Sequence, residues 1–160
     1  MFLQDEKKEL SNKKIIDLQN YIRSNIPITD YMNFHVEELQ SYSIKLSAPI
    51  KPNDNHYGTA FGGSLATLGI LAGWSILHFR ATEENLKCVL VIQEGSMKYI
   101  RPALTDFEAT CDTLNEELWN EFKNNLLAKG KTRISMATNL YSQGELVATH
   151  QGIFVGLARA

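Results

Sequence analysis

Residues 55–80 have the sequence NHYGTAFGGSLATLGILAGWSILHFR, which is a glycine-rich loop followed by an apolar segment. From Leu65 to Phe79 nearly every position is apolar or small, so a helix over 64–79 has no polar stripe and is expected to be buried. The apolar run of fifteen residues is shorter than the roughly 20 that span a bilayer. The pattern therefore predicts the central helix of a globular core and no membrane partner.

Small residues recur along this helix at Gly62, Ala66, Gly69 and Gly73, in steps of four, three and four. Such steps place them on one helical face. Each interior glycine costs about 1 kcal/mol of helix stability relative to alanine. The spacing therefore favours an element that packs closely against this face, and we expect it to be a sheet wrapped around the helix.

The bulk properties of the chain limit its function. Its 160 residues suit one domain, and its formal net charge of −2 offers no electrostatic footprint for nucleic acid. The first residues contain no apolar run of signal-peptide length. The sequence thus predicts a cytoplasmic protein with no nucleic-acid partner.

We divide the chain into an N-terminal helical extension, residues 1–26, and a main domain, residues 27–160. The charged residues 1–10 are expected to fray. A helix is then capped by Ser11 or Asn12 and carries an apolar stripe at spacings of three and four.

Five segments alternate apolar and polar residues as strands do, or are continuously apolar. They are 34–50, bent near Gln40, and 88–100, 104–113, 132–141 and 146–157. A helix between Asn115 and Gly130 is inserted before the last two. We expect the last four segments to pair in chain order as an antiparallel meander, which gives an α+β fold.

Three short motifs resemble a known family. They are Asn-x-x-Gly-Thr-x-Phe-Gly-Gly at 55–63, Met-Lys-Tyr-Ile-Arg-Pro at 97–102 and Gly-Lys-Thr-Arg-Ile at 130–134. Together with the element order over residues 30–158, they resemble the hotdog-fold acyl-thioester enzymes and, more narrowly, the YiiD C-terminal thioesterase family. The resemblance implies a hotdog domain, in which a curved antiparallel sheet of five to six strands wraps around a buried helix. It also implies a homodimer or dimer of dimers, with the site at a subunit interface.

The resemblance implies roles for the loop. The backbone N–H of Gly62 is expected to hold the thioester oxygen, since an unpaired N–H at the positive end of a helix stabilises an oxyanion. Asn55 is expected to orient water or donate to the same oxygen, and its alternative is an Asx turn that closes the loop. The remaining loop residues are expected to contact substrate: Gly58, Thr59, Phe61 and Gly63.

Two positions depart from the family pattern. The motif histidine is Phe61, and the helix carboxylate expected seven residues after the second glycine is Ile70. The usual general base is therefore missing.

Four other side chains are candidates to replace that base or to contact substrate. Glu94 interrupts an apolar strand and would be a third catalytic residue, or else a solvent-exposed residue at a strand end. Ser96, on the same strand, would contact substrate from the second subunit. His56 is a loop base or a solvated side chain, and Ser64 is a substrate contact or a helix cap.

Four cations are candidates for binding the phosphates of coenzyme A or a phosphopantetheine arm, and their alternative is scattered surface charge. They are Lys98, Arg101, Lys131 and Arg133. The histidines have no ligand spacing, so no metal is expected. No cofactor is expected apart from the coenzyme A or phosphopantetheine portion of the substrate.

The sequence thus favours hydrolysis of an acyl thioester carried by coenzyme A or an acyl carrier protein. Decarboxylation of a malonyl thioester is the main alternative, because an enolate needs a hydrogen-bond donor but no base to activate water. A non-catalytic module that binds acyl thioesters is the third.

Overall fold

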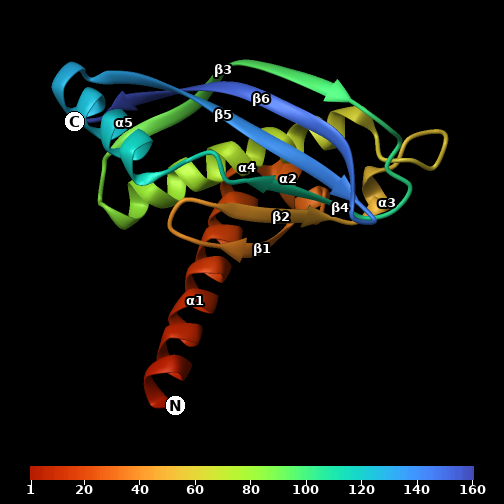
Figure 1. Ribbon diagram of the computed structural model, residues 1–160, viewed down its shortest axis with the longest axis horizontal. Helices are drawn as coiled ribbons and strands as arrows, with labels where there is room; N and C mark the ends of the chain where they lie inside the picture. The colour runs from red at the N-terminus through yellow and green to blue at the C-terminus, as the bar shows by residue number, and fades with distance from the viewer.

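The computed structural model describes residues 1–160 as one antiparallel sheet of six strands curved around helix α4, Gly62–Glu83 (Figure 1). The strand order is β1-β2-β4-β5-β6-β3, which leaves β1 and β3 at the two edges. The strands are β1 His35–Leu39, β2 Ile44–Ala48, β3 Cys88–Tyr99, β4 Phe107–Cys111, β5 Lys131–Ser142 and β6 Glu145–Ala158. The expected α+β hotdog architecture is confirmed.

The place of β3 in the sheet differs from the expected meander. It pairs with β6 along its whole length and not with β4, its neighbour in sequence. The chain between β3 and β4 crosses the end of the sheet, where the N–H groups of Ile100 and Arg101 donate to Val147 O and Ala103 O accepts from Ala60 N. The two bonds to Val147 continue the pairing of β3 with β6 beyond Tyr99. The chain then crosses to β4, so of the last four strands only β4, β5 and β6 form a meander.

The segment 34–50 is a hairpin and not one bent strand. Strands β1 and β2 pair antiparallel, and Gln40 N donates to Ser43 O at the turn with a distance of 2.9 Å. The turn contains no glycine or proline, so a bend and not a turn was expected there. Two short helices flank the hairpin, α2 Pro27–Tyr31 before it and α3 Ile50–Asn53 after it.

Helix α4 has 22 residues and is longer than expected at both ends. It is long and apolar enough to cross a membrane by length and composition, so the length argument made from the sequence was wrong. Its apolar side chains are buried within the curve of the sheet, as the spacing of small residues predicts. A Cβ atom built on Gly69 would lie 2.8 Å from His150 Cβ, and one built on Gly73 would lie 2.9 Å from Phe154 Cε2. The close approach at these two glycines is confirmed.

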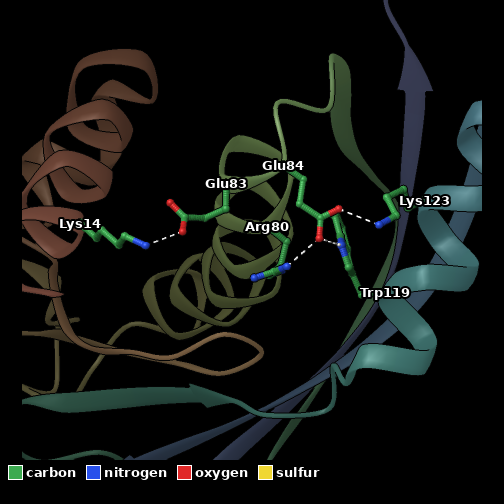
Figure 2. Close-up of polar contacts among 6 residues, drawn as sticks. All are labelled: Lys14, Arg80, Glu83, Glu84, Trp119 and Lys123. Carbon is green, nitrogen blue, oxygen red and sulfur yellow. Dashed lines mark hydrogen bonds and ion pairs between the residues drawn. The ribbon is translucent and has the colours of Figure 1, made fainter. Parts of the chain in front are cut away.

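Helix α1, Phe2–Asn25, includes residues 2–10, which were expected to fray. Its C-terminal half packs on the domain through Leu18 and Ile22, which are buried, while its N-terminal half projects away from the sheet (Figure 1). An ion pair between Lys14 and Glu83 ties α1 to the end of α4 (Figure 2).

Helix α5, Glu116–Lys129, holds the other side of the C-terminal end of α4. Glu84, the residue after α4, accepts from Trp119 Nε1 at 3.1 Å and pairs with Lys123 Nζ at 2.9 Å and Arg80 at 2.7 Å (Figure 2). The hydrogen bond from Lys123 is the main cause that lowers the pKa of Glu84, with Trp119 and Arg80 contributing. This end of the central helix is therefore firmly anchored.

Candidate active site

The glycine-rich loop is a small hairpin that leads into α4. Phe61 N donates to Asn53 O and Asn55 N donates to Thr59 O, each at 2.8 Å. At the tip, Asn55 Oδ1 accepts from the N–H groups of Tyr57 at 2.9 Å and Thr59 at 3.2 Å, and Asn55 Nδ2 donates to Thr59 Oγ1 at 2.9 Å. The Asx turn is thus present, and one N–H of the Asn55 carboxamide is left for any other contact.

Helix α4 begins directly behind this hairpin with two open hydrogen-bond donors. Phe61 occupies the N-cap position with φ −62° and ψ 135°, and no side chain caps the helix. The N–H groups of Gly62 and Gly63 have no acceptor within the protein, and the first turn carries no acidic residue. Ser64 N donates to Phe61 O at 2.9 Å, so Ser64 lies inside the first turn and is not the cap. The positive end of the helix is left uncompensated.

Two aromatic rings flank these open donors. The hydroxyl of Tyr99, at the end of β3, donates to Gly62 O at 2.9 Å, and a Cβ atom on Gly62 would lie 3.3 Å from the Tyr99 ring. The ring of Phe61 lies against Gly63, where a Cβ atom would be 2.5 Å from Phe61 Cε1. Sequence reasoning missed Tyr99, because its partner is 37 residues away and no local pattern signals the contact.

A cavity of about 250 Å³ lies between α4 and the edge strand β3. It brings together Glu94 and Ser96 with Ile70, at the position where the family carboxylate was expected. Glu94 follows a bulge in the pairing of β3 with β6, and both Glu94 and Ser96 are exposed in the single chain. Bulges often re-aim side chains beside active sites. The lining residues are Ala66, Ile70, Ile92, Gln93, Glu94, Gly95, Ser96, Met97 and His150.

Asn55 and Gly62 do not line this cavity. Gly62 and Ile70 are eight residues apart on α4, which is about 12 Å along the helix axis. Within one subunit, Gly62 and the cavity that Glu94 lines are therefore too far apart to contact the same thioester carbonyl group. His56 is exposed, with its ring 4.5 Å from that of Tyr57, and Gly58 takes a positive φ of 77° at the tip of the loop.

The candidate phosphate-binding cations lie in two separate places. Lys98 is opposite Thr149 on β6 and Arg133 is opposite Val155, six residues further along the strand. This separation is about 20 Å. Arg133 Nε donates to Gln93 at 2.8 Å, and Arg101, beyond the end of β3, pairs with Glu145 at 2.9 Å. Within one subunit the four cations do not form a single cluster.

The curved sheet, the buried helix and the open glycine N-terminus together define a protein of the hotdog class. Over residues 15–158 the chain matches the family described as "Putative thioesterase (yiiD_Cterm)", and it belongs to that family.

Similar solved structures extend over almost the whole chain. A protein of unknown function from Chlorobaculum tepidum is 29% identical, with a TM-score of 0.87, covering 93% of this chain and 97% of its own. A "putative thioesterase" from Shewanella oneidensis is 23% identical, with a TM-score of 0.81 and coverage of 91% and 99%. A "probable thioesterase" from Pseudomonas aeruginosa is 21% identical, with a TM-score of 0.79 and coverage of 90% and 96%. At such identities the last two show the shared fold.

Proposed function

We propose that this protein hydrolyses acyl thioesters of coenzyme A or of an acyl carrier protein. The observation that carries the proposal is the start of α4, where two glycine N–H groups have no acceptor and no acidic or capping side chain neutralises the helix dipole. The thioester carbonyl oxygen binds the Gly62 N–H, which stabilises the negative charge that develops on it as water attacks. One such donor contributes about 10²–10³-fold to the rate.

The complete site needs two subunits. Strand β3 has 12 residues and forms one edge of the sheet, with Val91 and Tyr99 44% and 54% exposed. An open edge of this length is suited to pairing with a second copy. If β3 of two copies paired antiparallel about a two-fold axis near Met97, Tyr99 would lie opposite Gly95 of the partner subunit. Gly62, which contacts Tyr99, would then lie near the partner's Gly95 as well. This arrangement would close the 12 Å gap between the oxyanion donor and the Glu94 cavity.

Within such a homodimer, which can pair further into a dimer of dimers, one subunit supplies Gly62 and the Asn55 loop. The other supplies Glu94 and Ser96. Lys98 and Arg101, near the Tyr99 end of β3, then bind the phosphates of the coenzyme A or phosphopantetheine arm. A monomer at micromolar concentration in sedimentation analysis would contradict this model. A cytoplasmic location stays a prediction from the sequence.

Malonyl-thioester decarboxylation is the second candidate, and Ile70 is the observation that favours it. The cavity wall is apolar where the family carboxylate was expected, and an enolate needs the Gly62 donor without a base.

One substrate panel separates the possibilities. The purified protein is incubated with acyl-CoA, malonyl-CoA and malonyl-carrier substrates, and free thiol and acetyl thioester are measured separately. Release of thiol is the expected result, and acetyl thioester formed without thiol would assign the decarboxylase instead. Binding of substrate with neither product would leave a non-catalytic module.

A further inference from the structure

His150 is a buried titratable side chain that takes no part in the Gly62 oxyanion site. It lies in β6, is 2% exposed, and its Nε2 atom is buried without a hydrogen-bond partner. Burying a polar group unpaired costs free energy, so such a group in a well-packed core calls for an explanation.

Three glycines from three elements make room for the imidazole. A Cβ atom built on Gly69 of α4 would lie 2.8 Å from His150 Cβ, one on Gly95 of β3 would lie 3.0 Å from Nε2, and one on Gly152 of β6 would lie 2.9 Å from Cε1. None of the three has a positive φ. Space around the histidine, and not backbone conformation, therefore accounts for glycine at these positions.

His150 is one of the residues that line the cavity between α4 and β3. The exposed residues Glu94 and Ser96 line this cavity together with buried His150. Ile92 Cδ1 lies 3.2 Å and 3.1 Å from the Cβ positions built on Gly95 and Gly152, so Ile92 and His150 border the same two glycines. Ile92 is itself half-buried and lines the cavity.

We propose that His150 is the catalytic proton acceptor of this thioesterase and takes the role of the carboxylate that Ile70 replaces. The inference rests on the proposed function and on the two-subunit site. As the water oxygen bonds to the thioester carbon, one water proton passes to Nε2. When the carbon–sulfur bond breaks, that proton passes to the leaving sulfur, which gives acid and thiol and restores the neutral imidazole.

The surroundings of His150 favour its neutral form. Burial lowers its pKa, which favours the neutral ring, the form that can accept a proton. Glu94 is the only other ionisable residue that lines the cavity. The groups packed around the ring from α4, β3, β5 and β6 carry no charge: Gly69, Ile70, Ile92, Gly95, Met97, Thr138 and Gly152.

The first test compares His150→Gln with His78→Gln. His78 is a matched control, because it is also partly buried with a lowered pKa but stacks between Tyr21 and Trp74, outside the cavity. We expect His150→Gln to lower kcat for thiol release by about 100-fold or more, with KM changed less than about threefold, while His78→Gln keeps wild-type kcat. A folded His150→Gln variant with kcat within about threefold of wild type would overturn the proposal.

A second pair of measurements excludes a purely structural role. His150→Ala leaves space for free imidazole, and rescue of kcat by substituted imidazoles should rise with their pKa, as general-base catalysis requires. If the kcat restored by the added imidazoles did not depend on their pKa, the proposal would be overturned.

Gly95→Ala gives a test that keeps His150 in place. Its methyl group would lie 3.0 Å from Nε2, so we expect kcat to fall at least about tenfold in a folded protein. Full activity in this variant would count against His150 even if neither His150 variant folds. If the wild-type protein releases no thiol from any substrate, the proposed function and this inference are both wrong. If the wild type and the variants are all active, only this inference is wrong.

Discussion

The two ends of helix α4 are built in opposite ways. At the C-terminal end, Glu84 is held by Arg80, Trp119 and Lys123, and Arg80 also supplies a positive charge in the last turn (Figure 2). At the N-terminal end no side chain caps the helix, and the N–H groups of two glycines have no acceptor.

This difference assigns stability to the C-terminal end of α4 and catalysis to its N-terminal end. The end with paired charges and a buried indole holds the helix inside the sheet, so changes there should lower the free energy of unfolding. The open end keeps donors that a cap or an acidic residue would satisfy, so changes there should alter catalysis more than folding. Four predictions test this division.

The largest effect on stability is expected from Trp119→Ala. The indole is fully buried and stacks on Phe122 with the ring centroids 5.5 Å apart, so its removal should cost about 3–5 kcal/mol. Phe61→Ala, at the open end, removes a ring that is 56% exposed and should cost less than about 1 kcal/mol. Urea unfolding curves would measure both losses of unfolding free energy, provided that the slope of free energy against urea concentration is the same in each variant. Equal losses would mean that the two ends of α4 are not distinct.

Gly62→Pro should have the largest effect on catalysis. Proline has no N–H, and it suits the first residue of a helix, while Phe61 already has the extended ψ of 135° that a residue before proline prefers. We expect kcat/KM for thiol release to fall about 10²–10³-fold with little change in unfolding free energy. Gly62→Ala is the matched control, because it adds a Cβ atom 3.3 Å from Tyr99 but keeps the N–H. Equal activity in the two variants would contradict the oxyanion role.

The sequence predicted what depends on local spacing. The glycine steps at Gly69 and Gly73 predicted close packing on the sheet, and Asn115 and Gly130 predicted the two ends of α5; all four positions behave as expected. Each of these signals lies within a few residues of the structure that it determines.

Pairings between distant residues could not be predicted in this way. The place of β3 beside β6 rests on pairing between residues that are far apart in the sequence. Tyr99 and His150 likewise lie against distant glycines, which are Gly62 for Tyr99 and Gly69 and Gly95 for His150. The turn at Gln40–Ser43 has no glycine or proline, so the sequence indicated a bend near Gln40 but not a hairpin turn. Apolar periodicity determines which face of a strand is buried but not which strand lies beside it.

Glu84→Gln should have a smaller and pH-dependent effect. The side chain is 28% exposed, and the variant keeps its shape but loses the charge that Lys123 and Arg80 bind, so we expect a loss of about 1 kcal/mol at pH 7. Because the folded state lowers the pKa of Glu84 below its ordinary 4.5, the charge stabilises the fold above that pH. The advantage of the wild type should disappear as the pH falls through the lowered pKa. Melting temperatures of both proteins across this range would check it, and a constant difference would contradict the role of the charge.

Tyr99→Phe tests the hydrogen bond that a distant side chain makes to the open end, and its effect should be the smallest. The variant removes the hydroxyl that donates to Gly62 O but keeps the ring that lies against this glycine. Because Tyr99 is 54% exposed, water can replace the lost bond, and we expect less than about 1 kcal/mol of lost stability. Catalysis should fall by a few fold, up to about tenfold, since the direction of the Gly62 N–H is then less firmly held. Parallel measurement of kcat and of urea unfolding separates the two effects. A loss of stability with unchanged kcat would mean that Tyr99 anchors β3 and has no part in aligning the oxyanion donor.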